Sequence, residues 1–109
     1  GAINDYMART LGQKLAESWG QQVIVDNRPG AGTIIGTDLV AKSAPDGYTL
    51  LLASTALAIN VTLYPKLPFD VQRDFAPVTR IGSAPLLLVS SAQLPVKTVA
   101  ELVALAKAK

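Results

Sequence analysis

The sequence predicts an α/β fold in which a mostly parallel sheet is flanked by helices. Segments with helical spacing of apolar residues alternate with short apolar runs rich in β-branched and aliphatic residues, in the order α-β-α-β-α-β-α. Such alternation is typical of a parallel, doubly wound sheet. Two loops rich in glycine or hydroxyl residues follow predicted strands, at the carboxyl ends where sheets of this class bind ligands.

The first predicted helix covers about residues 5–18, because apolar side chains recur there at helical spacing, namely Ala8, Leu11, Leu15 and Trp19. Asn4 and Asp5 are natural N-cap residues, and Gly20 is a natural stop. A short buried strand follows at 23–25, where all three residues are apolar and β-branched.

A second helix is expected after the loop at 26–32. Thr33 can cap it, and it runs to about residue 42 with Ile35, Leu39 and Val40 toward the core. The turn at 45–47 reads Pro-Asp-Gly, in which proline presets φ and glycine relieves the last position. A buried strand at 48–53 comes next, and a short helix at 56–60 follows it.

The rest of the chain is predicted to be irregular, then extended, then helical. Residues 64–74 contain two prolines and are expected to be irregular, and residues 78–90 have the character of a strand interrupted at Gly82 and Pro85. Thr98 and Glu101 form a capping box that opens a final helix, with Leu102 and Leu105 on one face.

The composition excludes several classes of function. The 109 residues are 50% hydrophobic and 17% charged with no low-complexity tract, which is typical of one folded domain or one lobe of a larger one. Cysteine and histidine are both absent, so the chain can build no disulfide, Cys-ligated zinc site, imidazole base or Ser-His-Asp triad. The net charge of +2 comes from scattered residues, which makes nucleic acid a poor candidate partner.

No membrane insertion is expected. Residues 48–65 carry no charge, but polar residues interrupt them and we interpret them as two separate elements rather than a span of about 20 apolar residues. The N-terminus has no basic region followed by an apolar core, so we expect no signal peptide within this chain.

The glycine-rich loop has two interpretations. Gly30, Gly32 and Gly36 follow a predicted strand and enter a helix, which is similar to a dinucleotide-binding motif and would suggest a nucleotide-dependent α/β enzyme fragment. The spacing departs from that motif, however, and no ribose-binding acid ends the next strand. The favoured interpretation is a tight turn with close helix packing.

The polar loop residues also have structural and functional interpretations. Ser54 and Thr55 can cap a helix or hydrogen-bond a ligand, and the two roles are compatible. Asn4 and Asp5 face the same choice. Arg28 beside Asp26 is more typical of a local ion pair than of a ligand clamp. The residues alone therefore predict an α/β lobe with two helix N-termini suited to an anion, and no catalytic machinery.

Five segments, taken in order and spacing, resemble the tripartite tricarboxylate transporter receptors, also called the Bug family: VDNRPGAG at 25–32, GTDLVAK at 36–42, APDGYTLL at 44–51, NVTLYPKL at 60–67 and DFAPV at 74–78. The resemblance implies a type II periplasmic-binding-protein-like fold, with two lobes that close like a flytrap. Residues 1–76 would then be most of lobe I without its first strand, 77–92 the crossover or hinge strands, and 93–109 the start of lobe II.

The same resemblance implies a periplasmic receptor that captures a small carboxylate for the membrane subunits of a tripartite tricarboxylate transporter. The ligand would be a dicarboxylate, a tricarboxylate, an acidic amino acid or an aromatic acid, with no cofactor and no catalysis. A sensory lobe that docks on a membrane kinase is the alternative use of such a module.

The resemblance also implies which residues bind the ligand, through backbone N–H groups, hydroxyls and bridging waters. They are Ala2, Ile3, Asn4 and Asp5 in a first loop, Thr33 in a second, and Ser54, Thr55, Ala56 and Asn60 in and after a third. In the first loop Gly1 and Ala2 replace the family's usual glycine pair, while Asp5 keeps the acid. Because about half of the cleft would come from other residues, we expect this chain alone to bind weakly or not at all.

Overall fold

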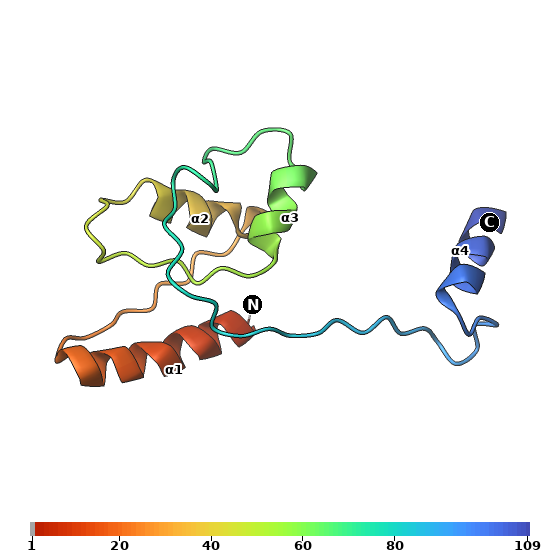
Figure 1. The fold of residues 1–109 in the computed structure, drawn as a ribbon, viewed down its shortest axis with the longest axis horizontal. Coiled ribbons are helices and arrows are strands. Elements are labelled where there is room, and N and C mark those ends of the chain that lie inside the picture. The colour runs from red at the N-terminus through yellow and green to blue at the C-terminus, as the bar shows by residue number, and fades with distance from the viewer. Residues whose placement is uncertain (1) are drawn as a thin grey trace. The chain divides into compact units, whose positions relative to one another are not determined.

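The computed structural model describes residues 2–109 and contains four α-helices. They are α1 (Ala2–Trp19), α2 (Ile34–Ala41), α3 (Ala56–Leu63) and α4 (Val99–Ala108), with a 3-10 turn, η1 (Ala31–Thr33), directly before α2 (Figure 1). All four helices predicted from the sequence are therefore confirmed. The chain divides into two compact units, Gly1–Pro77 and Val78–Lys109.

Helix α1 begins earlier than predicted. Residues 2–5 form its first turn rather than a loop, so the prediction that Asn4 and Asp5 cap the helix from outside is wrong. Asp5 lies in the first turn, where a negative charge stabilises the helix dipole without acting as a cap. Gly20 ends the helix as predicted, with φ +66 and its N–H donating to the carbonyl of Ala16 at 2.9 Å. The predicted loop residue Gly1 lies outside the described residues.

Helix α2 starts without the predicted cap. Thr33 has a left-handed backbone (φ 80), and its side chain caps nothing, so the capping prediction is wrong. A left-handed residue turns its side chain away from the first helical N–H groups, whereas a capping residue has an extended backbone. Ile35 and Leu39 are about half exposed, at 51% and 44%, so they do not form the expected core; Thr37 is the buried residue of this helix.

The predicted strands are extended but unpaired. Residues 2–109 contain no β-ladder, and none of the apolar residues of these segments is buried: Ile24, Tyr48 and Leu86 are 81%, 93% and 97% exposed, while Val23, Val25, Leu51 and Leu52 are half-buried. The expectation that they are buried is wrong for this structure. A parallel strand is buried only when neighbouring strands and covering helices surround it, and the described residues supply no such neighbours.

Two apolar contacts help to hold the first unit together. Phe69 is its buried apolar residue, 6% exposed, and its ring packs edge-to-face on Phe75 with centroids 5.9 Å apart. Such aromatic pairs stabilise by about 0.5–1.5 kcal/mol beyond the area they bury. Helix α1 packs closely on the extended segment after it, because a Cβ placed on Gly12 would lie 3.2 Å from Val23 Cγ1.

The second unit ends in the predicted capping box. Thr98 Oγ1 accepts from the N–H of Glu101 at 3.2 Å, and Glu101 Oε2 accepts from the N–H of Thr98 at 3.2 Å and of Lys97 at 2.6 Å. This reciprocal pairing satisfies N–H groups that the first helical turn leaves free. None of the helices within residues 2–109 is long and apolar enough to cross a bilayer.

Candidate functional site

The predicted ligand residues lie in three places in the first unit. Ala2 to Asp5 form the start of α1, and Thr33 ends η1. Ser54 and Thr55 directly precede α3, while Ala56 and Asn60 lie within it. The turn η1 contacts both α2 and α3, which also contact each other. The structure therefore brings Thr33 and Asn60 into one cluster around η1. Figure 1 shows α2 and α3 next to each other in this unit.

The loop at 30–33 is left-handed throughout. Its φ angles are 128, 45, 61 and 80 for Gly30, Ala31, Gly32 and Thr33. Glycine adopts such angles freely, but Ala31 and Thr33 each carry strain of roughly 1–2 kcal/mol. Local bonds close the loop: the N–H of Thr33 donates to the carbonyl of Gly30 at 3.0 Å, and the N–H of Ile34 donates to the carbonyl of Ala31.

Those two bonds leave other backbone N–H groups available. Among acceptors in residues 2–109, none takes a hydrogen bond from the N–H of Ala31 or Gly32. Both residues are exposed, so these N–H groups can reach solvent or a ligand. Successive N–H groups in a left-handed turn that leads into a helix form an anion-binding concavity.

The carbonyl side of the same loop is held by buried side chains. Asn60 is 4% exposed, and its Nδ2 donates to the carbonyl of Gly32 at 2.7 Å. Thr37 is 3% exposed, and its Oγ1 donates to the carbonyl of Thr33 at 2.9 Å. A Cβ on Gly32 would lie 3.3 Å from the Tyr64 hydroxyl, so this side of the loop is closely packed.

Ser54 caps the start of α3. Its Oγ accepts from the N–H of Ala56 at 3.3 Å, and its carbonyl accepts from the N–H of Leu57 at 3.0 Å. Thr55 makes no side-chain cap. The capping interpretation is thus confirmed for Ser54 and not for Thr55. Both residues are exposed while Ala56 is half-buried, and the Ser54 hydroxyl still has its own hydrogen to donate.

Asp5 connects the start of α1 to the segment that precedes the left-handed loop. Its Oδ1 accepts from Asn27 Nδ2 at 2.6 Å, and its Oδ2 accepts from Arg9 Nε at 3.0 Å. The hydrogen bonds from Arg9 and Asn27 lower the pKa of the Asp5 carboxyl from its usual value. Asp5 is therefore a carboxylate at neutral pH, and its charge disfavours direct contact with an anion.

Other predicted residues have simpler settings. Ile3 is exposed by 67% and Asn4 is half-buried, while the side chain of Ala2 lies outside the description. Arg28 pairs with Asp26 at 2.9 Å on the surface, which confirms the local ion pair. Sequence reasoning missed Asn27, because no local spacing signals its bond to a residue 22 positions earlier.

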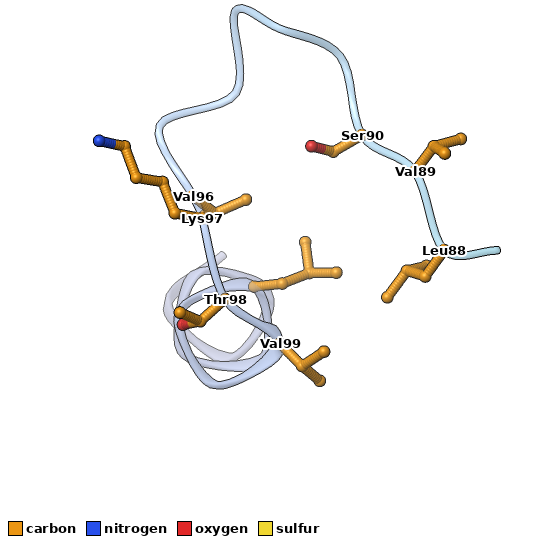
Figure 2. A pocket seen from close by; sticks show the side chains of 8 residues that line it. Leu88, Val89, Ser90, Val96, Lys97, Thr98 and Val99 are labelled. Atoms are coloured by element: carbon orange, nitrogen blue, oxygen red, sulfur yellow. The ribbon is translucent and has the colours of Figure 1, made fainter.

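Neither of two depressions in the described part of the chain is lined by a predicted ligand residue. An open depression of about 510 Å³ lies over α3 and is lined by Ala58, Ile59, Thr62 and Leu63. A smaller one of about 150 Å³ lies in the second unit, between residues 88–90 and the start of α4 (Figure 2). No three acidic side chains in the described part of the chain come together to hold a metal ion. The cluster around η1 presents the exposed loop residues Ala31, Gly32 and Thr33 above the buried Thr37 and Asn60, and we call it an exposed half-site.

The sequence profile of the family described as "Tripartite tricarboxylate transporter family receptor" matches residues 7–109. The chain belongs to this family. It is 47% identical over 111 residues to "Protein BugT" of Bordetella pertussis, an alignment that covers 100% of the chain and 34% of that relative. It is 43% identical over 107 residues to the "UPF0065 protein in tcbD-tcbE intergenic region" of Pseudomonas sp., covering 98% and 32% respectively.

A further relative of this receptor family comes from Agrobacterium vitis. The "UPF0065 protein in the TAR-I ttuE-ttuC' intergenic region" is 41% identical over 107 residues, covering 98% of the chain and 31% of the relative. The chain spans about a third of the length of the curated relatives it matches. No solved structure matches it. Receptors of this family have a periplasmic-binding-protein-like fold.

Proposed function

We propose that residues 1–109 form part of an extracytoplasmic solute-binding receptor that captures a small carboxylate. The observation that carries the proposal is the family match over residues 7–109. The geometry adds support, because η1 and the start of α3 offer backbone N–H groups and hydroxyls in one unit. Groups of this kind hold a carboxylate without a converging arginine, because helix N-termini carry partial positive charge.

Within this receptor, residues 1–76 would be most of lobe I, 77–92 the crossover strands and 93–109 the start of lobe II. The division of the chain into Gly1–Pro77 and Val78–Lys109 supports the first boundary. The exposed apolar segments support a partial lobe, since Ile24 and Tyr48 lie where a sheet would bury them. The site would comprise residues 2–5, Thr33 and 54–56, with Asn60 beside them; within it the Asp5 carboxylate would hold Asn27 rather than touch the anion.

The proposed ligand is a dicarboxylate, a tricarboxylate, an acidic amino acid or an aromatic acid. The proposed partners are the membrane subunits of a tripartite tricarboxylate transporter, and the proposed compartment is the periplasm. A receptor of this kind can also dock on a membrane kinase. Pull-down of the receptor with each class of membrane protein separates the two uses, because the ligand-binding part is the same in both.

The glycine loop needs no nucleotide to account for it. A Cβ on Gly36 would lie 3.2 Å from the carbonyl oxygen of Arg28, so this glycine lets α2 pack on the preceding loop. Gly30 and Gly32 supply the left-handed backbone of the turn. These observations favour the structural interpretation of all three glycines over a dinucleotide site.

The test is a thermal-shift screen of the full-length receptor that carries this chain. The ligands are C3 to C8 dicarboxylates, citrate, glutamate and benzoate, with NAD and ATP as controls. A ligand at about 100 times its dissociation constant adds about 2.7 kcal/mol of stability. Stabilisation by one or a few carboxylates supports the proposal. Stabilisation by NAD or ATP alone would contradict it and favour the nucleotide-dependent enzyme.

A further inference from the structure

We propose that Asn60 is a positioning residue, which together with Thr37 fixes the backbone of the left-handed loop at 30–33 so that its N–H groups face the ligand. The inference rests on the proposed function. It differs from the sequence-based expectation, in which Asn60 touches the ligand itself. The structure directs this amide to the protein backbone instead, through the bond from Nδ2 to the carbonyl of Gly32.

Burial distinguishes the two side chains that hold the loop. Asn60 and Thr37 are the buried polar residues of the described part of the chain, 4% and 3% exposed. A buried polar group that lacks a hydrogen-bond partner destabilises the fold, so the partner that a buried side chain does have indicates its structural role. Both side chains donate to consecutive carbonyls of the same loop, those of Gly32 and Thr33, at 2.7 and 2.9 Å.

The Asn60 bond also sets the direction of a peptide group in the loop. In a trans peptide the carbonyl and the N–H of one unit point in opposite directions. Holding the Gly32 carbonyl toward α3 therefore fixes the plane that carries the N–H of Thr33, which closes the turn onto Gly30. With the turn closed, the N–H groups of Ala31 and Gly32 have no acceptor among the described residues, and both residues are exposed.

The left-handed loop is also strained. Ala31 and Thr33 have φ angles of 45 and 80, which residues other than glycine adopt at a cost. Such a conformation persists only where the surroundings hold it. The Asn60 bond reaches across 28 residues of sequence from α3 to the loop, so it is a tertiary contact of the kind that can hold the loop against its local preference.

The test uses the full-length receptor with four variants. Thr37→Val and Asn60→Ala remove the donors, and Thr37→Ser keeps the hydroxyl. Thr62→Val makes the same change as Thr37→Val at an exposed threonine of α3 and is the matched control. The first readout, taken without ligand, is hydrogen exchange at the N–H groups of Thr33 and Ile34, which close the loop.

We expect exchange at these two groups to be roughly 3- to 10-fold faster in Thr37→Val and Asn60→Ala, the factor that the loss of one hydrogen bond produces. Thr37→Ser and Thr62→Val should exchange like the unmodified receptor. Unchanged exchange in both donor-deleting variants would overturn the proposal. Because Thr37→Val keeps the shape of the side chain, it remains informative if Asn60→Ala fails to fold.

The second readout is calorimetric affinity for succinate, citrate, glutamate and benzoate. A positioning residue acts through backbone N–H groups that every carboxylate uses, so each ligand that binds should lose affinity by a similar factor of roughly 3 to 10 in Asn60→Ala. Loss confined to one ligand would mean that Asn60 touches that ligand, and would overturn the proposal. If no carboxylate of the thermal-shift screen binds the unmodified receptor, the proposed function fails, while the exchange readout still decides whether Asn60 holds the loop.

Discussion

Replacing Gly30 with alanine should destabilise the receptor and weaken ligand binding together. Gly30 has φ 128 and ψ 157, a region that is essentially restricted to glycine and costs another residue about 1–3 kcal/mol. The added Cβ would lie 2.6 Å from Ile35 Cδ1. That atom ends a flexible, half-exposed side chain, so rotation relieves most of the clash. The backbone term then dominates, and we expect a loss of about 1–3 kcal/mol.

Two control substitutions separate the contributions. Gly82→Ala adds a Cβ in open space at a φ that alanine tolerates, so it should be neutral or stabilise by about 0.4–1 kcal/mol. Gly47→Ala adds a Cβ in open space at φ +82, so it carries backbone strain without a neighbouring clash and lies away from the proposed site.

Urea unfolding of the full-length receptor measures these differences, and calorimetry with a bound carboxylate measures the effect on the site. Gly30→Ala should lower both the unfolding midpoint and the affinity, whereas Gly47→Ala should lower only the midpoint. If Gly30→Ala unfolds at the same urea concentration as Gly82→Ala, the left-handed loop is not as described and the reasoning is refuted.

Three further predictions concern charge, capping and the isolated chain. The hydrogen bond from Arg73 lowers the pKa of Asp74 to about 2, so the pair contributes stability above about pH 4 that is lost as the pH falls toward 2. A carboxyl NMR titration should give a midpoint of about 2 for Asp74, and Arg73→Gln should raise it. A midpoint near 4 in the unmodified protein would refute the pairing. Thr98→Ala should destabilise α4 by about 1 kcal/mol, while Thr98→Ser should change its stability little. If the N–H of Glu101 exchanges at the same rate in both variants, the capping box is contradicted. Residues 1–109 alone should bind carboxylates weakly, and a submicromolar dissociation constant by calorimetry would show that the exposed half-site suffices.

The sequence was most informative where local chemistry decides the structure. Gly20 stops α1 and the pair Thr98 and Glu101 opens α4, because each acts within one turn of helix. Predictions failed where a distant contact decides. Thr33 has the composition of a cap, but the loop before it is left-handed and is held by Asn60 from another helix.

The apolar runs show a second limit of prediction from sequence. Ile24 and Leu86 have the character of buried strand residues, yet they are 81% and 97% exposed. Apolar character specifies what a segment needs for burial, while burial itself depends on the neighbours that cover it. Asp5 is a related case: its type suggested a cap, but it pairs with Arg9 at i+4 spacing and with Asn27, which no local spacing connects to it.

The measurement that tests the central claim most directly is an amide chemical-shift titration of the 15N-labelled full-length receptor with the carboxylate that stabilises it most. Our account predicts that the largest shifts fall on the N–H groups of Ala31, Gly32, Ser54 and Thr55, with Asn60 Nδ2 keeping its bond to Gly32. Shifts that leave these four N–H groups unchanged and fall elsewhere in residues 1–109, such as the depression beside α4, would contradict it.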